Sequence, residues 1–211
     1  MYLPNVITPP TIEPCSLADL KAHIRVTHSN DDTLIAFYGK AAREYVESRT
    51  GRTMFKTTYE VVRDRFPGAP GGLAWSSFIN LPRAAPLTSV TSVKYTDSSG
   101  AVTTWDPANY IVNTDAMPGV ISPVYGGTWP SYTPQPTASV RIRYVAGLSD
   151  TASPLVYPDE GLIAIIKLLV EGMYNFRGPV AVPEERGQTS AVVNQYGVEA
   201  LLAQYQVAYE F

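Results

Sequence analysis

The two histidines come closest to the usual chemistry of a metal or acid–base site. His23 and His28 are five positions apart, and neither lies in an HExxH or HxH pattern. One precedes and the other follows the expected end of a helix, so we interpret both as polar helix-end residues. Cys15 is the single cysteine, which excludes an intrachain disulfide and a cysteine-based zinc site. We expect no metal site.

Two acidic pairs and a glycine-rich loop are the next candidates for chemistry. Asp31 and Asp32 lie at an expected helix start, where capping and the helix dipole explain acidic residues. Glu184-Glu185 would need a cleft that perturbs its pKa values before it could act as an acid or base. The loop PGAPGG (67–72) is interrupted by prolines and is not a phosphate loop. No serine lies in a G-x-S-x-G pattern, so we expect no catalytic residue, no cofactor and no enzyme.

Two sets of side chains could bind an extended ligand. Arginines that share strand faces could bind nucleic acid, and tryptophans near turns could stack on sugar rings. The arginines are Arg49, Arg52, Arg63, Arg65, Arg141 and Arg143, and the tryptophans are Trp75, Trp105 and Trp129. Solvated strand faces and ordinary packing explain both sets. A carbohydrate- or peptide-binding module that uses the tryptophans is the alternative hypothesis for function.

Composition narrows the class of protein. The 211 residues include 16 Lys and Arg against 19 Asp and Glu, a net charge of −3, which excludes a generally basic nucleic-acid binder. Charged residues make up 17%, below the usual ~25%, so we expect partners to cover part of the surface. The apolar 45% is enough for a core, and the most apolar stretch, Gly161 to Val170, is too short to span a bilayer. We expect a soluble protein made in a reducing cytoplasm.

Helical patterns flank the middle of the chain. Residues 1–15 are rich in proline and predict an extended arm. Ser16-x-x-Asp19 resembles a capping box and opens a helix over 16–27. A broad apolar stripe predicts a second helix over 31–50, which Gly51 ends. A third helix, near 158–176, begins with Pro158 at its first position and is apolar almost all round.

The middle of the chain has the period-two pattern of strands. Residues 53–146 predict a compact β region of about six or seven strands, with a hairpin turn at 97–100. The expected strands are 53–66, 77–81, 90–96, 101–105, 110–113, 119–121 and 139–145. Residues 179–196 predict a linker. A short C-terminal helix follows, which is too short to be stable alone and must dock on something.

Several segments, taken in order, resemble a known family. They are TPPTIEPCSLADLKAHIRVTHSNDDTLI, AAREYVESRTGR, LPRAAPLTSVTSVKY, ISPVYGGTWP and VRIRYVAG, followed by the hydrophobic helix after a proline. This ordered set is similar to the head–tail connector (adaptor) proteins of tailed bacteriophages and prophages. The resemblance covers nearly the whole chain, although the part beyond about residue 179 matches least well. No single motif in the set is catalytic.

The resemblance implies a structural protein of the virion neck, made in the host cytoplasm. Such adaptors form a ring of about twelve identical subunits beneath the portal protein. They extend the DNA channel, through which DNA passes without sequence-specific binding, and they join the head to a stopper or tail-completion protein. The expected partners are therefore further copies of the chain, the portal and the stopper, and no membrane.

The residue patterns predict an α+β fold, and the resemblance gives roles to its parts, although the family usually lacks so extensive a β region. A mainly helical ring-forming body (16–52 plus 155–178) carries an inserted antiparallel β region (53–146). The arm (1–15) precedes it, and a linker with a C-terminal docking helix (179–211) follows. The portal-docking residues would be Val198, Leu201, Leu202 and Tyr205. Packing between subunits would use Leu34, Phe37, Tyr38, Tyr45, Ile166, Leu169 and Met173.

Overall fold

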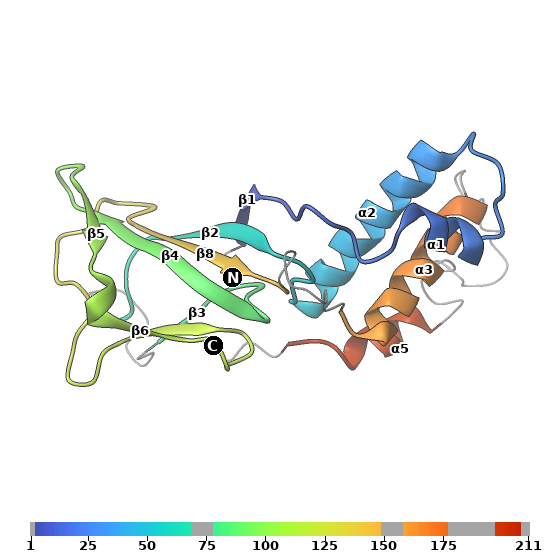
Figure 1. Cartoon of the computed structure of the whole chain (residues 1–211). Coiled ribbons are helices and arrows are strands. Elements are labelled where there is room, and N and C mark those ends of the chain that lie inside the picture. Colours follow the sequence, from blue (N-terminus) through green and yellow to red (C-terminus); the bar gives the residue numbers. More distant parts are fainter. Residues whose placement is uncertain (1–2, 69–77, 149–157, 177–196, 208–211) are drawn as a thin grey trace, which may run out of the picture. The chain divides into compact units, whose positions relative to one another are not determined.

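The computed structural model describes residues 3–68, 78–148, 158–176 and 197–207 (Figure 1). The chain divides into two compact units. The β unit consists of Met1–Thr11, Gly51–Ala152 and Val207–Phe211, and the helical unit consists of Ile12–Thr50 and Ser153–Gln206. The described elements are those of an α+β protein, with helices in one unit and antiparallel sheets in the other.

Helix α1 (Leu17–His23) begins at a complete capping box. The Ser16 Oγ accepts a hydrogen bond from the Asp19 backbone N–H at 3.1 Å, and the Asp19 carboxylate accepts one from the Ser16 N–H at 3.3 Å. The Ser16 side-chain hydrogen bond lowers the pKa of Asp19. The helix ends four residues before the predicted boundary of 16–27, because Arg25 takes a left-handed backbone conformation with φ of 58°.

Helices α2 (Asp32–Thr50) and α3 (Glu160–Asn175) follow the predicted ranges closely. They run antiparallel, since Tyr174 near the end of α3 donates a hydrogen bond to Asp31 just before α2, at 2.6 Å. The sequence predicted Pro158 as the first helical residue, and this prediction is wrong. Asp159 is the N-cap, and the helix starts at Glu160. The short helix α5 (Val198–Ala203) contacts both α2 and α3.

The β unit contains two antiparallel sheets (Figure 1). In the described residues, the larger sheet has the order β1-β2-β8-β4-β5 and the smaller has the order β3-β7-β6. The larger sheet is built from β1 (Asn5–Thr8), β2 (Thr57–Arg63), β4 (Leu87–Thr96), β5 (Val102–Trp105) and β8 (Val140–Ala146). The smaller is built from β3 (Ile79–Asn80), β6 (Tyr110–Asn113) and β7 (Val120–Pro123).

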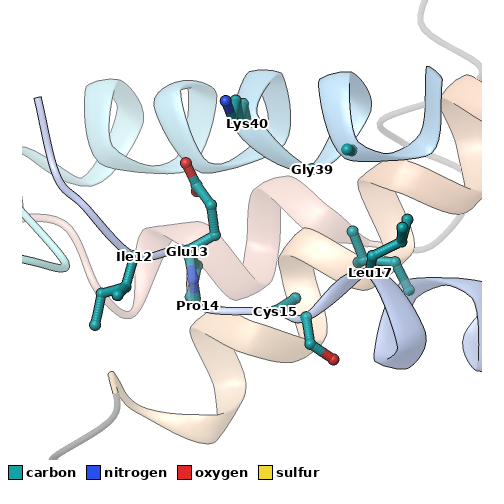
Figure 2. Close-up of a pocket in the computed structure, with 10 residues that line it drawn as sticks. Ile12, Glu13, Pro14, Cys15, Leu17, Gly39 and Lys40 are labelled. Atoms are coloured by element: carbon teal, nitrogen blue, oxygen red, sulfur yellow. The ribbon is translucent and has the colours of Figure 1, made fainter. Parts of the chain in front are cut away.

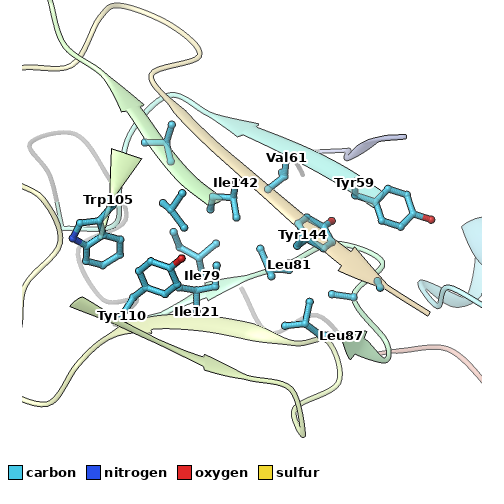
Figure 3. Packing of buried hydrophobic residues seen from close by; sticks show 14 of the residues in the cluster. Tyr59, Val61, Ile79, Leu81, Leu87, Trp105, Tyr110, Ile121, Ile142 and Tyr144 are labelled. Atoms are coloured by element: carbon cyan, nitrogen blue, oxygen red, sulfur yellow. The ribbon is translucent and has the colours of Figure 1, made fainter. Parts of the chain in front are cut away.

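Alternation along the strands creates the core between these sheets. In β8, Val140, Ile142 and Tyr144 are fully buried, whereas the intervening Arg141 and Arg143 are exposed. Figure 3 shows the side chains of Val61 and Ile142 from the larger sheet gathered with Ile79 and Ile121 from the smaller. The described part of the β unit is therefore a sandwich with an apolar cluster between its two sheets.

The turn between β4 and β5 follows the predicted hairpin signal. The Asp97 carboxylate accepts hydrogen bonds from the backbone N–H groups of Ser99 and Ala101 at 2.8 and 3.0 Å. Gly100 has φ of 85°, which a residue with a Cβ rarely adopts. The side-chain hydrogen bond from Ser99, with the backbone bond from Ala101, lowers the pKa of Asp97.

Candidate assembly surfaces of the helical unit

A buried arginine holds the segment before α1 against α2. The Arg43 side chain is 7% exposed, and its Nε donates to the Glu13 carboxylate at 2.8 Å. Its Nη1 donates to Glu47, one turn further along α2, at 2.9 Å. Burial opposes the positive charge, but Glu47 and Glu13 outweigh it and raise the pKa of Arg43. The residues around position 13 are therefore fixed to α2 by a charged contact.

This anchored segment and α2 enclose a groove. Figure 2 shows the chain from Ile12 to Leu17 running alongside α2, with Gly39 and Lys40 on the helix beside it. The groove contains a hollow of about 390 Å³. A second hollow of about 480 Å³ shares Leu17, Ala36 and Lys40 with the first and extends along α2. The remaining residues of the second hollow are Asp32, Thr33 and Phe37.

Gly39 sets how closely α1 approaches α2. A Cβ at this position would lie 2.8 Å from Leu20 Cδ1, and Leu20 is only 2% exposed. A larger residue would therefore require the buried Leu20 side chain to shift. The sequence analysis missed the groove, and a glycine within a predicted helix was the one signal that could have indicated a close helix contact.

Cys15 lies in the wall of the groove without reactive character. Its side chain is buried, and this burial raises the pKa of the thiol to about 11. The charge of Lys167 acts in the opposite direction but is the smaller effect. A thiol with such a pKa stays protonated at neutral pH, and the protonated form is the less nucleophilic one.

Helix α5 is held against α2 by polar contacts. Tyr45 Oη and Arg49 Nη2 donate to the two carboxylate oxygens of Glu199, at 2.9 and 2.7 Å. Both hydrogen bonds lower the pKa of Glu199, and the bond from Arg49 has the larger effect. Just beyond α5, Tyr205 covers Gly161 at the start of α3 so closely that a Cβ there would have no room.

The four predicted portal-docking residues are not all on an open face. Val198 and Leu202 are 1% and 0% exposed, because α5 packs on α2 and α3 of its own helical unit. Leu201 is 37% exposed and Tyr205 is half-buried. Val198 and Leu202 therefore face the interior of their own helical unit in this arrangement, and portal docking by the four residues stays a prediction.

The residues predicted for packing between subunits separate into two groups. Ile166 and Leu169 are 0% and 4% exposed within the helical unit, so they form its own core. Phe37 is 63% exposed and is open to a partner. The half-buried members are Leu34, Tyr38, Tyr45 and Met173.

The candidate acid–base residues have structural partners. His23 Nε2 lies 3.3 Å from the Glu171 carboxylate, and Lys21 Nζ lies 2.6 Å from Asp32. Asp31 accepts the hydrogen bond from Tyr174. Glu184 and Glu185 lie outside the described residues. In the described part of the chain no group of three or more His, Cys, Asp or Glu side chains could hold a metal ion.

The arginine and tryptophan sets are also engaged. Arg141 and Arg143 both pair with Glu60 on the neighbouring strand, at 3.1 and 3.0 Å. Trp105 is 7% exposed, and Trp129 stacks on the buried ring of Phe66 with centroids 5.2 Å apart. These two indoles therefore do not form an open platform for a sugar, and Trp75 lies outside the described residues. Among the helices described here, none has the length and apolar character needed to cross a membrane.

Comparison with known proteins finds a family model that matches part of the sequence. Residues 15–72, from the groove through α1, α2 and β2, match the family model described as phage gp6-like head-tail connector protein. None of the curated proteins matches the sequence.

Solved structures are similar over the whole chain. A chain in the neck of an empty GTA particle, computed with C6 symmetry, is 20% identical with a TM-score of 0.73, over 99% of this chain and 97% of that chain. A chain in the virion of the native gene transfer agent particle has 20% identity and a TM-score of 0.72 over the same shares. A chain in the native GTA neck, computed with C12 symmetry, has 20% identity and a TM-score of 0.70, over 100% and 97%. The resemblance seen in the sequence is thus confirmed: residues 15–72 match the model of phage gp6-like head-tail connector proteins, and the fold is similar to that of chains in GTA necks.

Proposed function

We propose that this chain is a structural adaptor in the neck of a tailed phage or phage-like particle. In that role it forms a ring beneath the portal, extends the DNA channel, and joins the head to the stopper or tail. The observation that carries the proposal is the likeness to neck chains over 99% of this chain and 97% of theirs, together with the connector family model. A relative that aligns almost end to end leaves little of either chain for a different function.

The proposed ring has about twelve copies. The similar neck structures are computed with C6 and C12 symmetry, which supports cyclic symmetry for this chain as well. A cyclic ring needs heterologous contacts, in which one face of a subunit meets a different face of the next. Exposed apolar side chains occur in both units, including Leu3 at 74%, Phe37 at 63% and Val102 at 65%, which suits a chain that completes its surface by assembly.

The charge of the chain suits a channel through which DNA slides. The net charge is −3, and Arg141 and Arg143 are paired with Glu60 rather than left for phosphate groups. Strong neutralisation of phosphates by cations would hold DNA in place. We therefore propose passage of DNA without sequence-specific binding and without catalysis.

Portal docking is proposed for α5 in a narrower form than the sequence predicted. While α5 stays on α2 and α3, Leu201 lies on its open side and Tyr205 is partly accessible. Val198 and Leu202 would contribute by holding the helix in place for the portal. The six-residue helix could not provide a docking surface alone, because helices of this length are unstable in water.

The direct test combines the purified chain with the portal protein of the same particle. Negative-stain electron microscopy is expected to show a ring of this chain coaxial with the portal ring. A chain that stays monomeric and does not bind the portal at any salt concentration would be evidence against the adaptor function. In the same preparation, tryptophan fluorescence with soluble glycans tests the binding-module alternative, for which buried Trp105 predicts no shift.

A further inference from the structure

The groove beside α2 combines an exposed aromatic ring with an unpaired cation. Phe37 borders the second hollow and is 63% exposed. Lys40 lines both hollows, is exposed, and has no ion pair or hydrogen bond to any described residue. A surface that offers apolar contact around one free ammonium group fits a protein segment that carries a carboxylate.

Most carboxylates of the helical unit are already engaged within the chain. The carboxylates that form a hydrogen bond or an ion pair within the chain are Glu13, Asp19, Asp31, Asp32, Glu44, Glu47, Glu171 and Glu199. In the described part of this unit, Asp159 and Glu160 are exposed and have no side-chain partner. Asp159 is the N-cap of α3, yet its side chain makes no capping hydrogen bond.

The groove and these two carboxylates lie on different parts of the helical unit. The groove uses the first half of α2, from Asp32 to Lys40. The start of α3 lies toward the other end of α2, because the two helices are antiparallel and the end of α3 meets Asp31. Figure 1 shows the same arrangement within this unit, with α2 in blue and α3 in orange. A heterologous ring contact requires two such separate faces on each copy.

We propose that the groove of each subunit receives the start of α3 from a second copy, with Asp159 and Glu160 facing Lys40 and apolar contact made on Phe37. This inference rests on the proposed ring function and deepens it by naming both faces of the contact between subunits. The contact repeats from copy to copy around the ring. Its occupant is another copy of this chain, and the portal and stopper bind elsewhere.

Charge reversal at Lys40 tests the groove. Lys40→Glu is expected to raise the protein concentration needed for half-maximal ring assembly on the portal by about tenfold or more, measured by sedimentation and electron microscopy. Phe37→Ala should act in the same direction. Lys94→Glu is the matched control, since Lys94 is exposed on the β unit and does not line either hollow, and it should leave assembly unchanged. Circular dichroism of each variant checks that the subunit is folded.

A charge swap tests the occupant. Asp159→Lys combined with Glu160→Lys should weaken assembly alone and should restore it when combined with Lys40→Glu. Rings that form equally well from wild type and Lys40→Glu would overturn the inference and leave the adaptor function standing. Loss of assembly without any rescue would also overturn it, because it would assign the groove to another partner. A wild-type chain that builds no ring on the portal would instead refute the proposed function, and this inference with it.

Discussion

Arg43 shows how single side chains organise the helical unit. Its guanidinium joins Glu13, which precedes α1, to Glu47 on α2, and the pair of Arg43 and Glu47 is almost fully removed from solvent. Removing one partner of such a buried pair leaves an uncompensated charge, which commonly costs 3–5 kcal/mol, about the scale of a domain's whole reserve of stability. The geometry of the groove therefore depends on Arg43 and Glu47, which line neither hollow.

The thiol of Cys15 is expected to be unreactive in the folded chain. Its pKa is raised from 9.0 to about 11, so at pH 8 the reactive thiolate is reduced about a hundredfold relative to an unperturbed thiol. Labelling with a disulfide reagent should be slow at pH 8, should accelerate as the pH rises toward 11, and should be fast in urea. Rapid native labelling at pH 8, with circular dichroism unchanged, would contradict this burial.

Alternation and capping made most elements predictable. Residues 139–145 read as a strand because small and large apolar residues alternate with two arginines, and β8 occupies Val140–Ala146. Ser16 and Asp19 predicted the start of α1 correctly. Strand β1 was predicted only as an extended arm, since all four of its residues are exposed and its identity comes from pairing with β2.

What covers the apolar face of a helix could not be predicted from the sequence pattern. The sequence shows that one side of α5 is apolar, but local pattern does not say whether a partner or the same chain covers it. Leu202 is buried because α5 contacts α3 and also α2, which ends at Thr50, more than a hundred residues earlier in the sequence. The groove could not be predicted from the sequence either, because it depends on the close approach of Leu20 on α1 to Gly39 on α2.

Two neighbouring leucines on α5 separate folding from docking. Leu202→Asp would bury a charge at a position that is 0% exposed and should destabilise the helical unit by about 3 kcal/mol or more. Leu201→Asp, at 37% exposure, should change stability by about 0.5 kcal/mol and should weaken portal binding if α5 docks there. Urea unfolding and portal co-sedimentation measure the two effects. Equal loss of stability in both variants would show that α5 is placed wrongly.

At the scale of the whole molecule, each unit has its own interior. The apolar cluster of the sandwich draws all of its buried residues from positions between Tyr59 and Ala146. Strand β1 adds main-chain pairing to β2 but no side chain to that cluster. The part of the chain matched by the connector family model, residues 15–72, spans α1, α2 and β2, and so includes elements of both units.

A fragment of residues 51–152 is therefore expected to fold. It retains the buried cluster and all three tryptophans, and of the described strands it loses only the edge strand β1, whose hydrogen bonds contribute about 1 kcal/mol each. Its near-ultraviolet circular dichroism should reproduce the tryptophan bands of the full chain, with a lower urea midpoint. A spectrum with strand signal in the far ultraviolet but flat tryptophan bands would show that the core needs the helical unit.

The partners of the N-terminal segment are synthesised long after the segment itself. Glu13 leaves the ribosome 30 residues before Arg43, and Asn5 leaves it 55 residues before Glu60, its partner in the sheet. Folding during translation proceeds from the N-terminus, yet Asn5 and Glu13 cannot form these two contacts until β2 and α2 have emerged. Both contacts therefore form late, so a nascent chain that stalls before residue 43 would leave the segment before α1 accessible to chaperones and proteases.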